Sequence, residues 1–204
     1  HNVNHCLSWG RSEFVGCFES TPAEAEKFMA VAAGGSFVDD LRPTCTAMEI
    51  KEKLTFVHEL LGPNTRCSTF QDCVAWARLK FEEYFSNRIK QLTSSFPEDA
   101  KTSTGLPFWS PPKRFPVALT FSADDPEHIN FISAAANLRA KVSGVELPSG
   151  KLGLGVRDTA ELALMVSKVI VPEFRADPNK KIKVDDGKGG SVEQAGAGAA
   201  AGAP

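Results

Sequence analysis

Apolar residues recur at helical spacing along most of the chain, and the clearest run lies near its middle. One face of this run carries five large or small apolar residues: Phe70, Val74, Ala77, Phe81 and Phe85. Ser68 with Gln71, or Thr69 with Asp72, can cap the start of such a helix, and Pro97 ends it. The pattern therefore predicts one long helix that continues until this proline.

Further helices are expected on both sides of this run. Residues 1–18 show the same spacing, and other helices begin at capping signals: Thr21 with Glu24, Thr46 with Glu49, Asp125, and Asp158 with Glu161. The helix that begins at Thr46 has a dense apolar side, and Met48 is expected to fill the core there.

The connection from residue 97 to residue 116 lacks a regular period, yet it is rich in apolar groups: Leu106, Phe108, Trp109 and Phe115. A long loop of this kind is either disordered or packed against a core, and packing is the prediction here. The following segment, Val117–Phe121, predicts a short strand. Lys181–Val184 is a candidate second strand that would pair with it.

These patterns predict a mainly α fold, namely a compact multi-helix domain with at most a short two-stranded β element. The end of the chain is rich in glycine and alanine, which is typical of a flexible linker. The formal net charge of −2 over 204 residues argues against a dominant nucleic-acid partner. No apolar run is long enough to span a bilayer, and no signal peptide is evident.

The chain contains five cysteines: Cys6, Cys17, Cys45, Cys67 and Cys73. An odd number without a C-x-x-C pair disfavours a disulfide framework and fits a reducing compartment. His1 and His5 lie one helical turn apart beside Cys6, a spacing that can bind zinc. No second ligand pair follows, so a lone half-buried histidine is the favoured interpretation. A metal or redox module built on the thiols stays an alternative, which metal analysis would separate.

Several catalytic signatures are absent from the sequence. There is no G-x-x-x-x-G-K-[ST] or G-x-G-x-x-G loop for phosphates, and no Ser/His/Asp order stands out. The residues alone therefore indicate a mostly helical cytosolic domain that is part of a larger protein.

Four segments carry a family resemblance, in order along the chain: D-C-V-A-W-A-R-L-K-F-E-E-Y-F, then F-P-E-D-A-K-T-S-T-G-L-P-F-W-S-P-P-K-R-F-P, then P-E-H-I-N-F-I-S-A-A-A-N-L-R-A, then V-I-V-P-E-F. Together they resemble the second catalytic-cysteine half-domain of the ubiquitin-activating enzyme, from about His1 to Asp186. Sister enzymes that activate other ubiquitin-like modifiers share the A-A-A-N-L-R part but match the F-P-E-D to K-R-F-P part less well. They remain an alternative.

The resemblance implies an enzyme that adenylates ubiquitin with ATP and magnesium, forms a cysteine thioester and passes ubiquitin to a conjugating enzyme. Residues 1–176 would be its mobile half-domain, and residues 177–204 a crossover segment and linker. The implied partners are ubiquitin, ubiquitin-conjugating enzymes and the adenylation domains of the same chain, without nucleic acid or membrane. The resemblance also implies a monomer of cytoplasm and nucleus. This part would bind no cofactor and would be inactive alone.

The resemblance also bears on the nucleophile. In the family it sits in a P-x-C-T-[LI]-R pattern, just before a helix that reads like H-C-L-S-W-G, here His5 to Gly10. Cys45, in R-P-T-C-T-A-M, matches the first half of that pattern, but Met48 stands in place of the arginine and the order differs. The resemblance therefore places the nucleophile upstream of His1.

The candidate catalytic residues are Asp185 and Asp186, which follow Lys181–Val184. The matching family pair often reads Asn-Asp and lies near the nucleophile. Asp185 replaces the neutral asparagine, whereas Asp186 keeps the acid. A carboxylate there could orient the attack or help to deprotonate an incoming nucleophile, although it would also raise the pKa of a nearby thiol. The alternative is two solvated acids at the start of a linker.

A rival hypothesis is a helical interaction module without a catalytic role, such as a scaffold or adaptor. The two differ in what precedes His1, because only the enzyme requires a P-x-C-T-[LI]-R motif upstream and nucleotide-binding motifs in the flanking sequence.

Overall fold

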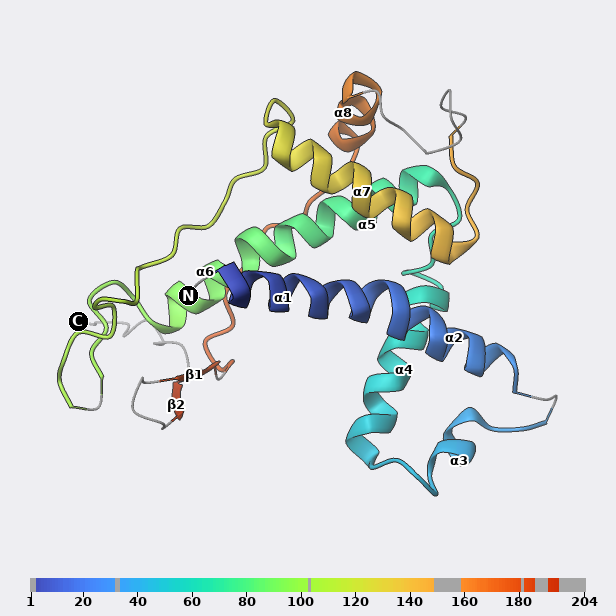
Figure 1. The fold of residues 1–204 in the computed structure, drawn as a ribbon, viewed down its shortest axis with the longest axis horizontal. Helices are drawn as coiled ribbons and strands as arrows, with labels where there is room; N and C mark the ends of the chain where they lie inside the picture. Colours follow the sequence, from blue (N-terminus) through green and yellow to red (C-terminus); the bar gives the residue numbers. More distant parts are fainter. Residues whose placement is uncertain are drawn as a thin grey trace, which may run out of the picture.

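A computed structural model describes residues 3–31, 34–102, 104–148, 159–180, 182–185 and 191–194, with residues 159, 183–185 and 191–194 as backbone only. The described chain is mainly helical and has one short β hairpin near its end (Figure 1). The predicted fold class, a multi-helix domain with a two-stranded element, is confirmed. No helix in these ranges is long and apolar enough to cross a bilayer.

The N-terminal elements are α1 (Val3–Val15), the π-helical turn η1 (Gly16–Ser20), α2 (Thr21–Met29), α3 (Phe37–Leu41) and α4 (Ala47–Leu61). The first three form one uninterrupted run, so the capping box predicted at Thr21 and Glu24 is wrong. Ser20 keeps helical backbone angles and makes no side-chain cap, while the Thr21 hydroxyl donates to the Gly16 carbonyl oxygen at 2.8 Å. The buried hydroxyl is thus used inside a continuing helix.

The central elements are α5 (Phe70–Glu82), the π-helical turn η2 (Glu83–Asn87), α6 (Arg88–Ser95), α7 (Pro126–Ser143) and α8 (Thr159–Ser167). The predicted Thr69–Asp72 capping box starts α5, and the predicted caps at Thr46–Glu49 and Asp125 start α4 and α7. Asp158, predicted to cap α8, lies outside the described residues.

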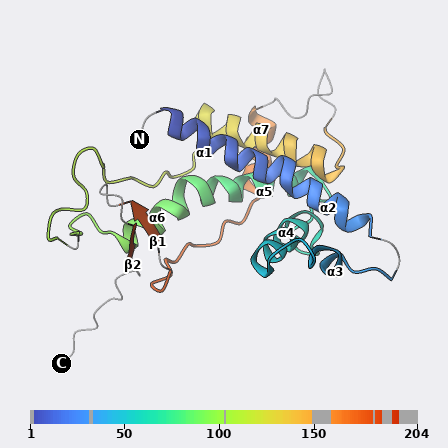
Figure 2. The same ribbon diagram turned by 60° about the horizontal axis from the view of Figure 1, so that its bottom comes forward.

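The hydrophobic core lies between α5, α7 and α8. Both α5 and α7 place small, fully buried residues in it, among them Cys73, Ala77, Ala136 and Ala140. Small side chains let two helices approach closely, which fits the extensive packing of α5 on α7. Figure 2 shows α1 running alongside this pair.

The long connection after α6 is packed, as predicted. The Phe96 and Phe108 rings are buried and stack with centroids 4.4 Å apart. The Trp109 indole nitrogen donates to the carbonyl oxygens of Phe96 and Pro97 at 3.0 Å each. The aromatic groups therefore hold the loop to the end of α6 instead of leaving it in solvent.

Two predictions about strands are wrong. Val117–Phe121 is extended but belongs to no described strand. Its Leu119 amide donates to the Phe85 carbonyl at 2.8 Å, and the Phe121 ring centroid lies 5.2 Å from that of Phe81. The segment therefore packs against η2 and α5 instead of pairing in a sheet. The actual hairpin joins β1 (Ile182–Asp185) to β2 (Ser191–Gln194), a strand inside the segment expected to be only linker.

Candidate functional site

The five cysteines differ sharply in exposure. Cys6 on α1 is exposed and Cys45 before α4 is half-buried, whereas Cys17, Cys67 and Cys73 are buried. A cysteine nucleophile must reach its substrate as a thiolate. Burial is therefore a first obstacle for three of the five thiols.

Cys45 lies in a turn that serves the start of α4. The Thr46 backbone amide donates to the Glu49 carboxylate at 2.7 Å, and Thr44 lies next to the sulfur, with 3.8 Å between its hydroxyl and Cys45 Sγ. Met48, predicted to fill the core, is instead 81% exposed. The turn therefore has a clear structural role as a helix cap, and no described basic side chain hydrogen-bonds to the sulfur.

A hydrophobic groove lies where α1 and η1 cross α5, η2 and α7. It encloses about 320 Å³ and is lined mostly by aromatic and small apolar side chains: Trp9, Gly10, Phe14, Phe18, Trp76, Phe85, Phe131, Ala134, Ala135 and Leu138. Its two π-helical turns meet through Cys17 Sγ and the Tyr84 hydroxyl, 3.5 Å apart. Burial raises the pKa of the Cys17 thiol, which keeps it protonated and unreactive.

Contacts along this groove attach α1 to the body of the domain. The Trp9 and Tyr84 rings pack edge to face with centroids 5.5 Å apart, and Arg88 donates to Glu13 at 2.7 Å. Because α1 contains no fully buried residue, these few contacts carry much of its attachment.

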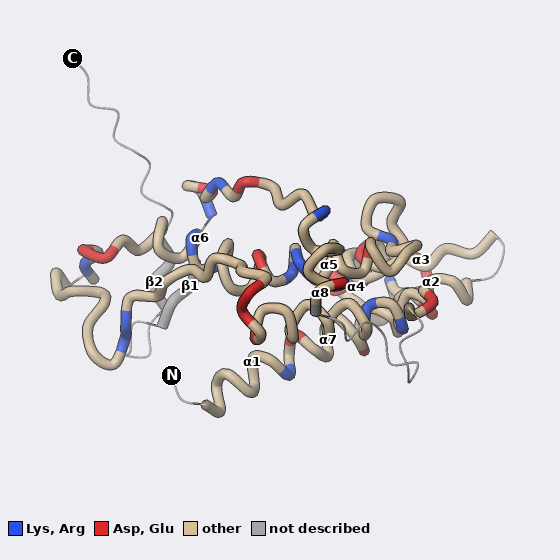
Figure 3. Tube along the Cα trace, turned by 90° about the horizontal axis from the view of Figure 1, so that it is seen from above, with Lys and Arg blue, Asp and Glu red and all other residues tan. Residues whose placement is uncertain are grey.

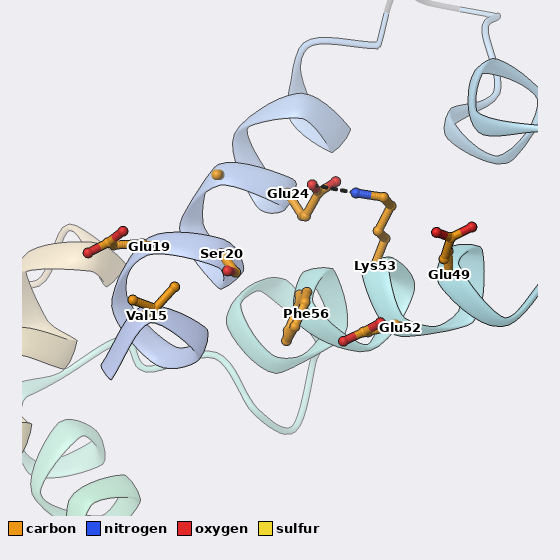
Figure 4. Close-up of a pocket in the computed structure, with 9 residues that line it drawn as sticks. Val15, Glu19, Ser20, Glu24, Glu49, Glu52, Lys53 and Phe56 are labelled. Atoms are coloured by element: carbon orange, nitrogen blue, oxygen red, sulfur yellow. Dashed lines mark hydrogen bonds and ion pairs between the residues drawn. The ribbon is translucent and has the colours of Figure 1, made fainter. Parts of the chain in front are cut away.

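A second cleft, of about 500 Å³, separates η1 and α2 from α4 (Figure 4). Carboxylates dominate its polar lining, which includes Glu19, Glu24, Glu49, Glu52 and Lys53. Glu24 is the most buried of them and accepts hydrogen bonds from Lys53 at 2.8 Å and Lys27 at 2.9 Å. Its charge is thus neutralised within the chain, so the cleft has the chemistry of a helix joint rather than of a catalytic centre.

Charges elsewhere follow the same local pairing. Figure 3 shows acidic and basic positions interspersed along the trace. Other ion pairs join Arg78 to Glu82 at 2.7 Å and Lys80 to Glu59 at 3.4 Å. The described charges therefore form local pairs of opposite sign.

The stability of the domain should depend on pH through Glu24. Burial alone would raise its pKa, but the hydrogen bonds from Lys53 and Lys27 outweigh burial and hold it below the ordinary value of 4.5. A lowered pKa in the folded state stabilises the fold above pH 4.5, and that contribution is lost as the pH falls through the folded value. We therefore expect Glu24→Gln to lower the free energy of unfolding by about 1 kcal/mol at pH 7 and to have a smaller effect as the pH falls below 4.5.

Urea unfolding of both proteins across this pH range measures the difference. Glu52→Gln, in the same cleft, is the matched control, because Glu52 makes no ion pair with a described residue. A difference that stays constant from pH 7 to pH 3 would contradict the assignment.

The predicted catalytic pair is only partly described. Asp185 ends β1, where its backbone is in register with Ser191, but its side chain and the whole of Asp186 lie outside the described residues. The β hairpin, α6 and the first residues of α1 lie toward the same end of the molecule in Figures 1 and 2. The structure therefore places β1, which Asp185 ends, toward the end of the molecule where α1 begins.

Gln91, which the sequence did not single out, fixes the backbone at Asp177, a few residues before β1 begins. The Gln91 side chain of α6 is buried, donates to the Asp177 carbonyl and accepts from the Asp177 amide, each at 2.9 Å. Since the two residues are 86 positions apart, no local pattern could have revealed the contact. Helical spacing also places Gln91 off the predicted apolar face of Ile89, Leu92 and Phe96, so the sequence offered no signal for it.

The residues with zinc-binding spacing, His1, His5 and Cys6, are only partly described. His1 lies outside the described residues. Where the chain is described, no group of three His, Cys, Asp or Glu side chains could hold a metal ion.

Comparison with known proteins covers most of the chain. The family model described as "Ubiquitin-activating enzyme, SCCH domain" matches residues 1–200. "Ubiquitin-activating enzyme E1 2" from Arabidopsis thaliana is 45% identical over 186 residues, which are 91% of this chain and 16% of the relative. "Ubiquitin-like modifier-activating enzyme 1" from Homo sapiens is 36% identical over 186 residues, or 90% of this chain and 16% of the relative.

The chain thus spans about a sixth of the length of the relatives that it matches (16% in both cases). The match includes both the helical body and most of the segment after α8. The chain therefore belongs to the ubiquitin-activating enzyme family and corresponds to its second catalytic-cysteine half-domain.

Proposed function

We propose that this chain is the mobile helical part of an ATP-dependent enzyme that adenylates ubiquitin, holds it as a cysteine thioester and passes it to conjugating enzymes. The observation that carries the proposal is family membership over residues 1–200. Thioester formation requires that an activated acyl group be brought to a thiolate. A mobile half-domain can bring the sulfur to the acyl-adenylate and then to the next enzyme.

The nucleophile is proposed to lie upstream of His1, in the order that the family motif has. Three observations support this assignment. Cys17, Cys67 and Cys73 are buried, Cys45 lacks the arginine of the motif and sits in a helix cap, and Cys6 lies within α1 without the motif. The chain before α1 would reach the end of the molecule where β1 lies, which also supports an accessory role for Asp185 and Asp186.

The adenylation step is assigned to other parts of the enzyme. ATP with magnesium requires phosphate donors and oxygen ligands, but the sequence lacks a phosphate-binding glycine loop. The described residues also offer no cluster of metal ligands. The described residues therefore do not fit the nucleotide, and the adenylation domains of the same protein would supply that site.

We expect a monomer in the cytoplasm and nucleus whose partners are ubiquitin, conjugating enzymes and its own adenylation domains. An enzyme for another ubiquitin-like modifier differs in one measurable respect, because it would form its thioester with that modifier in preference to ubiquitin.

The position of the nucleophile is tested by Cys45→Ala in the complete enzyme. We expect the rate and yield of the ubiquitin thioester to stay within about twofold of the unmodified protein, since Cys45 only precedes the Thr46 cap of α4 and takes no part in the proposed reaction. A non-reducing gel after incubation with ATP, magnesium and ubiquitin gives the yield. Loss of the reducible adduct in a protein that still adenylates ubiquitin would make Cys45 the nucleophile.

A further inference from the structure

The hydrophobic groove where α1 and η1 cross α5, η2 and α7 has no part in the proposed reaction. Its volume of about 320 Å³ lies at the lower end of the range of about 300–1,000 Å³ that is typical of small-molecule sites. A cavity of about 150 Å³ in a protein core holds one benzene molecule. The groove is therefore large enough for about two aromatic rings.

Aromatic side chains surround this space and meet edge to face. The Trp9 ring centroid lies 5.5 Å from that of Tyr84 and 6.2 Å from that of Phe85. The Phe18 and Trp76 centroids are 5.8 Å apart in the same kind of contact. Trp9 is 41% exposed, so part of this lining is open to solvent. An aromatic ligand gains from the same ring geometry as well as from burial of apolar area, so the lining favours an aromatic occupant.

A glycine leaves space in the groove on its α1 side. Gly10 lies in the middle of α1 and lines the groove. A Cβ atom there would meet no described atom within 4 Å beyond its own stretch of helix, so packing does not require a glycine. Glycine inside a helix is destabilising relative to alanine. What the missing side chain preserves is the open space of the groove.

The charged groups of the groove indicate an uncharged occupant. The charged side chains in its lining are Glu13 and Lys80. Glu13 accepts a hydrogen bond from Arg88 at 2.7 Å, while the Lys80 ammonium lies 3.1 Å from the Glu83 carboxylate and 3.4 Å from that of Glu59. Both groups are thus paired within the chain. A charged ligand would lose its hydration without gaining a free opposite charge.

We propose that this groove is a binding site for an uncharged aromatic small molecule of about two rings. Such a molecule packs against Trp9 of α1, Trp76 of α5 and Phe131 of α7, and it covers apolar area that is exposed in the free chain. The π-helical turns η1 and η2 both contribute to the lining, and such turns are frequent at functional sites. The site is independent of the thioester chemistry, because no step of that reaction uses the groove.

Benzophenone is a suitable probe, because it carries two rings without a charge and attaches to nearby C–H bonds under near-ultraviolet light. The complete enzyme is irradiated with increasing amounts of benzophenone and digested, and the labelled residues are located by mass spectrometry. We expect saturable labelling of side chains that line the groove, such as Phe14 and Leu138. The analogue para-benzoylbenzoate, which adds a carboxylate, should label them at least about tenfold less at equal concentration.

Leucine substitutions fill the groove from two different helices. Gly10→Leu on α1 and Ala134→Leu on α7 should each lower groove labelling by at least about tenfold, because both residues line the space. Gly10→Leu should keep the helix intact, since leucine favours helix more than glycine does. Gly16→Leu is the matched control, because a Cβ atom there also meets no described atom within 4 Å beyond its own helix, and Gly16 is not a lining residue. Its labelling should stay within about twofold of the unmodified protein.

Three results would overturn the proposal. The first is labelling that does not saturate and is as strong at Ile170, an 89% exposed residue outside the groove, as it is inside. The second is unchanged groove labelling in both leucine variants. The third is an absence of groove labelling in the complete enzyme, which would mean that another segment of protein covers the groove.

Discussion

Phe81→Ala should lower the free energy of unfolding of the domain by about 4 kcal/mol. Phe81 is 1% exposed, and its ring centroid lies 4.7 Å from that of His128 and 5.2 Å from that of Phe121. It thereby joins three parts of the chain, namely α5, α7 and the extended segment Val117–Phe121. Removing the ring leaves a cavity that the surrounding helices cannot fill without losing their own contacts.

Urea unfolding followed by circular dichroism measures the loss. Leu79→Ala is a matched control on the same helix, because Leu79 is 41% exposed, and it should cost about 1 kcal/mol or less. Equal losses for the two variants would contradict the assignment of Phe81 to the centre of the core.

Asp186→Ala in the complete enzyme should slow ubiquitin thioester formation or transfer by at least about tenfold. A positioned acid or base typically contributes about 10²–10⁴-fold, so a tenfold effect is a low threshold. The expectation rests on the family resemblance and on the place of β1, which lies toward the end of the molecule where α1 begins (Figure 1). Adenylate formation should be unchanged, because the nucleotide site lies elsewhere in the proposed enzyme.

Single-turnover thioester assays give the first rate, and pyrophosphate exchange gives the second. Asp99→Ala is the control, since Asp99 is an exposed acid in the long connection. Unmodified rates in both assays would return Asp186 to the role of a solvated linker residue. A fall in both rates would indicate damage to the fold instead.

Capping signals in the sequence predicted where a helix begins when the cap depended only on neighbouring residues. The Thr69–Asp72 box starts α5 because hydroxyl and carboxylate satisfy the free amides of the first turn. The same logic failed at Thr21, where a preceding helical turn already satisfied those amides. A capping signal identifies a possible start, and only the residues before it decide whether a helix begins there.

The sequence could not predict contacts between segments that lie far apart along the chain. Phe121 alternates with polar neighbours, as a strand residue would. Its ring nevertheless packs against that of Phe81, which lies 40 positions earlier in the sequence. Met48, predicted to fill the core, is 81% exposed because helical spacing places it on the side of α4 opposite the buried Val57. Periodicity reports that a face is apolar, whereas burial depends on what packs against that face.

At the candidate site, too, the sequence identified residue types but could not show their surroundings. The sequence identified the cysteines and the acidic pair, but it could not show that Cys17, Cys67 and Cys73 are buried. It also gave no hint of the Gln91–Asp177 contact, which fixes the path toward β1. Thiol reactivity depends on burial and neighbouring charge, and both arise only in the folded chain.

The most direct test of the account compares this chain alone with the complete enzyme. Each is incubated with ATP, magnesium and ubiquitin, and the products are separated with and without reducing agent. We predict that the isolated chain folds as a helical monomer but forms no adduct, while the complete enzyme forms a reducible ubiquitin thioester. A reducible ubiquitin adduct on the isolated chain would contradict the account, because both the nucleophile and the adenylation site would then have to lie within these 204 residues.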